Sequence, residues 1–292
     1  MSTSKKEATI IILAGQSNAV GVGHVDCLPR HFSAEKIQEY EKGYPSVRIH
    51  YYSHNKKNRD FDPVTVGCTE VSKLTIGPEL GLAEWFAETY PGRELFIVKC
   101  AYGGTSLWRD WLSPSNGEGY DAASFADQVP NVTEAIDNGR PLRSSWCYNE
   151  LVKLTRESLA MLEEEGYTPR IRGFCWMQGE ADACAAETMR DYAARYRNLV
   201  TDFSREFGDC AEGCIFADAG ISEVWPFWQE MNACKVDYAA AHGNGVFVDT
   251  VAAGLTTQYE PVGAPDTYHY DSDCVIKLGW LFGEALKAVI PE

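Results

Sequence analysis

Short apolar runs alternate along this chain with longer stretches in which apolar residues recur every three or four positions. A short apolar run bounded by turn residues is typical of a buried strand, and the longer pattern is typical of a helix with one buried face. The strand-like runs lie at residues 10–15, 47–53, 95–100, 171–177, 214–217 and 246–248. The helix-like stretches lie at residues 79–90, 146–165, 185–207, 228–241 and 273–289. Because strands separated by helices are joined by right-handed crossovers, we predict an α/β fold with a parallel sheet covered by helices on both faces.

The length of the chain suits one large domain, and its charge limits its partners. With 292 residues, of which 45% are hydrophobic, residues 1–292 are expected to form a single domain with a sizeable core. The net charge of -16 argues against binding to nucleic acid or to an anionic membrane surface, since both need a basic patch. Residues 112–141 are rich in Gly, Asn, Asp and Ser and show no period, so we expect a long loop insert there.

The N-terminus and the cysteines favour a reducing compartment. Residues 1–7 are polar, and the apolar run after them is short for a signal-peptide core and lacks a small-residue cleavage site. Most of the 10 cysteines lie in apolar segments, so we expect buried free thiols in a cytoplasmic protein, a secreted form with its signal removed being the alternative. Cys210 and Cys214 are close enough for a disulfide or half of a metal site, but no second pair with zinc-like spacing accompanies them. We therefore expect no metal and no other cofactor.

The first apolar run ends in Gly-Gln-Ser-Asn at residues 15–18. In an open α/β sheet, ligands bind beyond the carboxyl ends of the strands, which is where Ser17 would lie. If a helix begins at Ser17, its free N–H groups suit a developing oxyanion. The alternative is that Ser17 only caps that helix.

Three later stretches also bring polar groups to the predicted sheet edge. Paired glycines at residues 103–104 allow positive φ and let N–H groups approach a ligand, although a plain tight turn has the same pattern. Residues 176–182, Trp-Met-Gln-Gly-Glu-Ala-Asp, follow a strand-like run and contribute an amide and two carboxylates. Asp266 precedes His269 by three residues, so its carboxylate can receive the imidazole Nδ1–H and leave Nε2 as a base. A histidine at an acidic surface is the alternative for this last pair.

Together, the four stretches supply the groups that acyl transfer requires. Ser17 is the candidate nucleophile, His269 the candidate base and Asp266 the carboxylate that orients it. Three donors are candidates for an oxyanion hole: the N–H of Ser17, the N–H of Gly104 and the side-chain amide of Gln178.

The same stretches resemble the four sequence blocks of the SGNH hydrolase superfamily. They are Gly-Gln-Ser-Asn at residues 15–18, Gly-Gly-Thr-Ser at 103–106, Trp-Met-Gln-Gly-Glu at 176–180 and Asp-Thr-Tyr-His at 266–269. They occur in the order of the superfamily and span most of the chain. More narrowly, they resemble its sialate O-acetylesterase and acetylxylan esterase branch, the carbohydrate esterases of family six. The wider superfamily has Gly-Asp-Ser in the first block and an asparagine donor in the third, whereas Gln16 and Gln178 stand here, as in the acetylesterase branch.

This resemblance implies a flavodoxin-like fold, a three-layer αβα sandwich with a doubly wound parallel sheet. It also implies a metal-independent serine esterase that removes acetyl groups from carbohydrates through an acetyl-enzyme intermediate. Carried over by position, Ser17 is the nucleophile, His269 the base and Asp266 its partner, while Gly104 and Gln178 complete the oxyanion hole. The substrates it implies are acetylated xylan, oligosaccharides or sialic acid, and residues in the unmatched insert leave the choice among them open.

Three other functions were weighed against this one. An α/β-hydrolase with a Gly-x-Ser-x-Gly elbow is disfavoured, because Ala19 stands at the fifth position and the serine follows the first strand. An esterase acting on another small acyl ester or on a lipid is the main alternative. A non-catalytic carbohydrate-binding protein is less favoured, since Ser17, Asp266 and His269 are all present.

A second group of residues is expected to support the site or to contact substrate: Gln16, Asn18, Gly103, Glu180, Tyr102 and Trp108. Glu180 and Asp182 would form an acid/base pair in a glycosidase, but we expect Glu180 to brace the Ser17 loop by buried hydrogen bonds and Asp182 to cap the next helix. Trp108 or Tyr102 is expected to form a wall of the pocket, with core packing as the alternative for either ring. Several members of a further aromatic set are expected near this edge, and core packing is the default for any single member: Trp111, Trp225, Trp228, Tyr268 and Tyr270.

Overall fold

The first strand stands at the centre of the sheet. In the computed structural model, which describes residues 5–53, 56–68, 75–126 and 144–291, β1 runs from Lys6 to Gly15. Its segment 10–14 has no exposed surface. β1 pairs in parallel with β7 (Leu95–Ala101) on one side and with β8 (Tyr167–Met177) on the other. An unbroken apolar run is what a strand buried on both faces requires.

The main sheet has the strand order β10-β9-β8-β1-β7-β3-β4, with β5 paired to β3. Its remaining strands are β3 (Tyr44–Ser53), β4 (Lys56–Lys57), β5 (Asp62–Val64), β9 (Ile215–Ala219) and β10 (Gly245–Val248). All strands from β10 to β3 are parallel, whereas β4 and β5 run antiparallel to β3. A separate two-stranded sheet joins β2 (Gly23–His24) to β6 (Thr75–Ile76). The predicted parallel sheet is confirmed, and two short antiparallel strands, β4 and β5, extend it beside β3.

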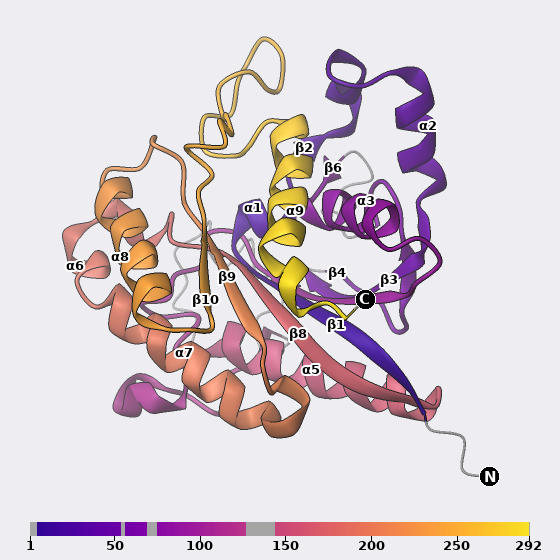
Figure 1. Ribbon diagram of the computed structural model, residues 1–292. Helices are drawn as coiled ribbons and strands as arrows, with labels where there is room; N and C mark the ends of the chain where they lie inside the picture. The colour runs from indigo at the N-terminus through magenta and orange to yellow at the C-terminus, as the bar shows by residue number, and fades with distance from the viewer. Residues whose placement is uncertain (1–4, 54–55, 69–74, 127–143, 292) are drawn as a thin grey trace.

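Helices cover both faces of this sheet, which gives the three layers that were predicted. The α-helices are α1 (Ser17–Val20), α2 (Ala34–Lys42), α3 (Pro78–Thr89), α5 (Trp146–Glu164), α6 (Ala186–Met189), α7 (Tyr192–Phe207), α8 (Trp228–Ala241) and α9 (Ser272–Leu286). The 3₁₀ helices are η1 (Val25–Arg30), η2 (Pro114–Gly119), η4 (Asp182–Cys184), η5 (Gly208–Ala211) and η6 (Lys287–Val289). Helices α3 and α9 lie on one face and α5 and α7 on the other (Figure 1).

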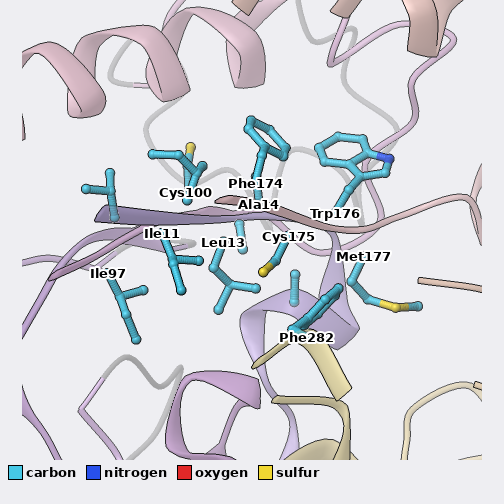
Figure 2. Close-up of a cluster of buried hydrophobic side chains, with 14 of the residues drawn as sticks. Ile11, Leu13, Ala14, Ile97, Cys100, Phe174, Cys175, Trp176, Met177 and Phe282 are labelled. Carbon is cyan, nitrogen blue, oxygen red and sulfur yellow. The ribbon is translucent and has the colours of Figure 1, made fainter. Parts of the chain in front are cut away.

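Side chains of β8 alternate between these two layers. Figure 2 shows Phe174 and Trp176 pointing to one face, and Cys175 and Met177 pointing to the other, where Phe282 of α9 lies. All five side chains are fully buried. The apolar core therefore fills both sides of the sheet, as the period of two in a strand requires.

Two helical predictions differ from the structure. The stretch 185–207 forms two helices, α6 and α7, which are separated at residues 190–191. It was predicted as one helix because the helical periodicity of its sequence continues across the break. Helix α2 was not predicted, since Tyr40 is its one buried residue and no apolar stripe marks it. The hydroxyl of Ser33 caps α2 by accepting a hydrogen bond from the N–H of Lys36 at 3.3 Å.

The expected insert at residues 112–141 is described only up to residue 126, and residues 127–141 lie outside the described residues. Its helix η2 is attached to α7, because the N–H and the hydroxyl of Ser115 donate to Asp202 at 2.7 and 2.6 Å. All 10 cysteines are free, including Cys210 and Cys214, so these two form no disulfide. Within the described ranges, none of the helices has both the length and the apolar character needed to cross a bilayer.

Candidate active site

Ser17 stands at the first position of α1, directly beyond the end of β1. Gly15 has φ +144°, and a Cβ there would collide with the carbonyl oxygen of Met177 in β8, so the tight strand end needs glycine. The carbonyl of Gln16 accepts the N–H groups of Ala19 and Val20, both at 2.8 Å, and so closes the first turn of the helix. Gln16 occupies the N-cap position, which means that Ser17 is not the cap. The side chain of Ser17 is half-buried, and its hydroxyl makes no hydrogen bond to another described residue.

The loop after β7 contains the second candidate backbone donor for an oxyanion, the N–H of Gly104. The N–H of Tyr102 donates to the carbonyl of Gly15 at 3.1 Å, so this loop stays beside β1. Gly104 has φ +68° and is exposed. Within the part of the chain that the structure describes, neither its N–H nor that of Ser17 donates to an acceptor. The hydroxyl of Thr105 fixes the loop by donating to the Tyr102 carbonyl at 2.7 Å.

The predicted third oxyanion donor, Gln178, lies in a different environment from the one expected. It follows β8, is fully buried and donates through Nε2 to Asp182 Oδ2 at 2.6 Å, to the Thr105 carbonyl at 3.1 Å and to Gln16 Oε1 at 3.4 Å. The amide thereby ties together the loops after β1, β7 and β8. Its role as an oxyanion donor stays a prediction, since both of its N–H groups are engaged with protein acceptors.

The expectation that Asp182 caps the next helix is wrong. Its carboxylate instead accepts the N–H groups of Leu107 at 2.8 Å and Trp108 at 2.9 Å, in addition to Gln178. The loop that contains Gly104 is therefore fastened to the loop after β8. Burial raises the pKa of Asp182 to about 6, against the opposing effect of these three hydrogen bonds.

His269 and Asp266 form the pair that their spacing predicted. Nδ1 of His269 lies 2.5 Å from Asp266 Oδ2, and Asp266 Oδ1 accepts the N–H of Tyr268 at 2.9 Å. Burial by itself would raise the pKa of Asp266, but the hydrogen bonds from His269 and from the Tyr268 N–H outweigh it and hold this pKa below its usual range. A carboxylate on Nδ1 leaves Nε2 as the free nitrogen of the imidazole.

Asn18 joins the histidine loop to the serine loop, a role that the sequence did not reveal. Its side chain is buried, its Oδ1 accepts the N–H of Tyr270 at 3.0 Å, and its Nδ2 lies 3.5 Å from the carbonyl of Tyr268. These two contacts lie on either side of His269. Nδ2 also donates to Glu180 Oε1 at 2.9 Å, which confirms that Glu180 braces the Ser17 loop. Burial raises the pKa of Glu180.

The two aromatic candidates for a pocket wall differ in their exposure. Tyr102 is fully buried and packs edge-on against Trp146 with ring centroids 4.7 Å apart, so its assignment as a pocket wall is wrong. Trp108 is 41% exposed and borders a surface hollow of about 490 Å³ together with Asn116 and Arg195. Gly103, which lies between Tyr102 and Trp108 in the sequence, is half-exposed.

Two buried lysines support the site loops, and the sequence analysis missed both. Lys99 in β7 donates to the carbonyl of Val20 at the end of α1 at 2.7 Å and pairs with Glu79 at 2.6 Å. Lys235 in α8 donates to the carbonyl of Gln178 at 2.7 Å and pairs with Asp218. The signal for Lys99 was a single charge inside an apolar strand, where a buried ammonium needs a carboxylate partner.

Within the described residues, one group of three side chains is close enough together to hold a metal ion, and none of its members belongs to the candidate site. It consists of Glu39, Glu84 and Glu88. The ammonium group of Lys36 lies among these carboxylates and forms ion pairs with all three.

Comparison with solved structures shows which fold this chain shares. NanS is similar with a TM-score of 0.68 and 16% identity over 98% of this chain and 98% of that one. A protein of Arabidopsis thaliana is similar with a TM-score of 0.63 and 18% identity over 97% and 98% of the two chains. A carbohydrate acetylesterase of Xanthomonas citri, XAC1771, is similar with a TM-score of 0.56 and 14% identity over 97% of this chain and 56% of that one. The fold is that of the SGNH hydrolase esterases.

The sequence comparison identifies the family within that class. The carbohydrate esterase family of sialic acid-specific acetylesterases matches residues 7–288, and the chain belongs to this family. No curated protein sequence matches the chain.

Proposed function

We propose that this carbohydrate esterase hydrolyses O-acetyl groups of sugars by a serine mechanism in which Ser17 transiently carries the acetyl group. The observation that carries the proposal is the His269–Asp266 pair, held next to the serine loop by Asn18. A nucleophile, a base and an orienting carboxylate are the groups that acyl transfer by a serine enzyme requires.

In the first half-reaction, Ser17 Oγ attacks the acetyl carbonyl carbon and its proton passes to His269 Nε2. The oxygen that becomes negative accepts hydrogen bonds from the N–H groups of Ser17 and Gly104, and the hydrogen bonds that fasten the Gly104 loop reduce its reorganisation during the reaction. The sugar oxygen then leaves with the proton from His269, and the acetyl group remains on Ser17. Asp266 is ionised because its pKa is held below the usual range, so it stabilises the imidazolium that forms.

In the second half-reaction, a water molecule attacks the acetyl-enzyme and gives its proton to His269. The tetrahedral intermediate collapses, acetate leaves and Ser17 regains its proton. The same two N–H groups serve both half-reactions, since the charge develops on the same carbonyl oxygen.

The test is acetate release from acetylated xylo-oligosaccharides, O-acetylated sialic acids and acetylated hexoses. We expect at least one of these to be hydrolysed, and Ser17→Ala to lower kcat by several powers of ten with the fold intact. Ser204→Ala, near the end of α7, is the matched control and should keep full activity. Near wild-type turnover in Ser17→Ala would refute the assignment.

A chain-length series separates this function from that of an esterase for longer acyl groups. Aryl esters from acetyl to octanoyl are compared by kcat/KM, and an acetylesterase should lose rate steeply beyond acetyl, because each added methylene has to fit a small pocket. A rate that rises with chain length would favour the alternative of a lipid or long-chain acyl ester. Activity that is abolished by a chelator and restored by zinc would contradict the serine mechanism.

A further inference from the structure

Two aromatic rings that the mechanism does not use pack against each other, and one of them belongs to the residue before the catalytic histidine. Tyr268 directly precedes His269 and is 55% exposed, although it is a large hydrophobic side chain. Its ring packs against that of Trp225, with centroids 5.3 Å apart and planes inclined by 39°. The two rings come from the loop before α9 and from the loop between β9 and α8.

The backbone of Tyr268 is fixed by Asp266 and by the supporting residue Asn18. Its N–H donates to Asp266 Oδ1 at 2.9 Å, and its carbonyl lies 3.5 Å from Asn18 Nδ2. Neither contact uses the side chain, so the ring leaves a rigid backbone and remains open to solvent. The position of the ring is therefore set by the same contacts that hold His269.

Trp225 is attached to the loop after β8. The N–H of Phe227 donates to the carbonyl of Ala183 at 3.0 Å, and the N–H of Trp228 donates to the carbonyl of Trp225 at 3.2 Å, which makes the turn a fixed support. The indole Nε1 of Trp225 is buried and has no hydrogen-bond partner among the described residues. A buried indole N–H normally finds an acceptor, so the hydrogen-bonding needs of the fold do not explain why a tryptophan stands here.

We propose that Tyr268, backed by Trp225, is the platform on which the pyranose ring of an acetylated sugar stacks while its acetyl group faces Ser17. The proposal rests on the proposed function and names the feature of the substrate that is recognised, a sugar ring with an apolar face. An exposed aromatic ring offers such a face a large contact area at little cost in conformational entropy. A ring carried by the residue before the base would place the sugar next to the proton donor for its leaving oxygen.

Trp108 is the competing surface, since it is 41% exposed and belongs to the loop of Gly104. The N–H of Trp108 is fixed to Asp182 at 2.9 Å, so it too stands on a rigid backbone. In contrast to Tyr268, however, no other aromatic ring among the described residues packs against it. The experiment has to assign recognition of the sugar to one of these two rings.

The experiment compares two acetate esters that differ in the sugar ring, a mono-O-acetylated methyl pyranoside and ethyl acetate. We expect Tyr268→Ala to lower kcat/KM for the pyranoside about tenfold, mainly through KM, and to change that for ethyl acetate by no more than about twofold. Tyr268→Phe, which keeps the ring, should restore the wild-type values. Tyr259→Ala is the matched control, because Tyr259 is 59% exposed and makes no ring contact within the described residues.

Each other outcome overturns the proposal. Equal losses on both esters would mean that the tyrosine only supports His269. A pyranoside-specific loss in Trp108→Ala, with none in Tyr268→Ala, would assign recognition to the Gly104 loop. If the wild-type protein hydrolyses ethyl acetate and no acetylated sugar, the proposed function fails and this inference fails with it. If it hydrolyses the sugar ester and Tyr268→Ala does so equally well, only this inference fails.

Discussion

Replacing Asp182 tests how the loop of Gly104 is held in place. The carboxylate accepts three hydrogen bonds, from the N–H groups of Leu107 and Trp108 and from Gln178 Nε2. An asparagine at this position keeps one acceptor oxygen, and its NH₂ group would face another N–H donor. We expect Asp182→Asn to lower kcat for an aryl acetate about a hundredfold, because a displacement of about 1 Å in catalytic geometry has an effect of that order.

The same substitution has a pH signature in stability that follows from the pKa of Asp182. Burial raises this pKa from 3.8 to about 6, a shift of roughly 2 units, which corresponds to about 3 kcal/mol of linked free energy. Because the folded state binds the proton more tightly than the unfolded state, the contribution of this group to stability is complete below its unfolded pKa and is lost as the pH rises through 6. The unfolding free energy of the wild type minus that of Asp182→Asn should therefore fall by about 2 to 3 kcal/mol between pH 4 and pH 7.

Urea denaturation at several pH values, followed by tryptophan fluorescence, measures this difference. Burial also raises the pKa of Asp218 to about 6, but Asp218 is present in both proteins and cancels. Asp237→Asn, at an exposed position on α8, is the control and should show no such trend. A difference that is constant or grows with pH would refute the assignment, as would a loss of activity that only follows the fraction of unfolded protein.

Three further substitutions test the remaining contacts of the site. Asp266→Asn should lower kcat about ten-thousandfold with little change in KM, since asparagine favours the wrong imidazole tautomer, and steady-state kinetics would contradict this if KM alone rose. Gln178→Ala should lower the melting temperature together with kcat, because its amide joins three loops; a hundred- to thousandfold fall in kcat at unchanged stability would instead identify an oxyanion donor. Asn18→Ala should lower the free energy of unfolding by about 2 to 4 kcal/mol and also kcat, since it leaves Glu180 and the Tyr270 N–H without partners; urea melts and kinetics equal to those of the wild type would disprove the bridge.

Sequence reasoning predicted the parts of the fold in which burial requires a regular pattern of apolar residues. Segment 10–14 of β1 is apolar throughout because both of its faces are covered, and the alternation of strands with helices then dictates parallel pairing. Strands β4 and β5 are only two and three residues long and carry charged residues, so no period can reveal them. Helix α2 was not predicted for a related reason, because a helix with one buried residue has no stripe of apolar residues along one face.

The candidate site likewise has some contacts that the sequence predicts and others that it does not. The spacing of Asp266 and His269 is local, so the pair could be predicted, and the structure places Nδ1 within 2.5 Å of the carboxylate. Two of the three partners of Asp182, the N–H groups of Leu107 and Trp108, could not be predicted, because they lie 75 and 74 residues away in the chain and are backbone groups, which every residue possesses. Tyr102 was misplaced because its position after β7 predicts the location of its backbone but not the direction of its ring.

Buried carboxylates, in addition to apolar packing, hold the loops of this site together. Three carboxylates that support the candidate site, Glu180, Asp182 and Asp218, are buried and have pKa values raised by burial. Each of them therefore lowers the stability of the folded protein near neutral pH relative to an exposed carboxylate. In return, hydrogen bonds to carboxylates are short and directional, so they fix the backbone of Leu107 more narrowly than apolar contacts would. Leu107 and Tyr102 of these loops also belong to the apolar core, so apolar packing buries the loops and the hydrogen bonds to carboxylates fix their backbone direction. Together the two supply the rigidity that catalysis requires.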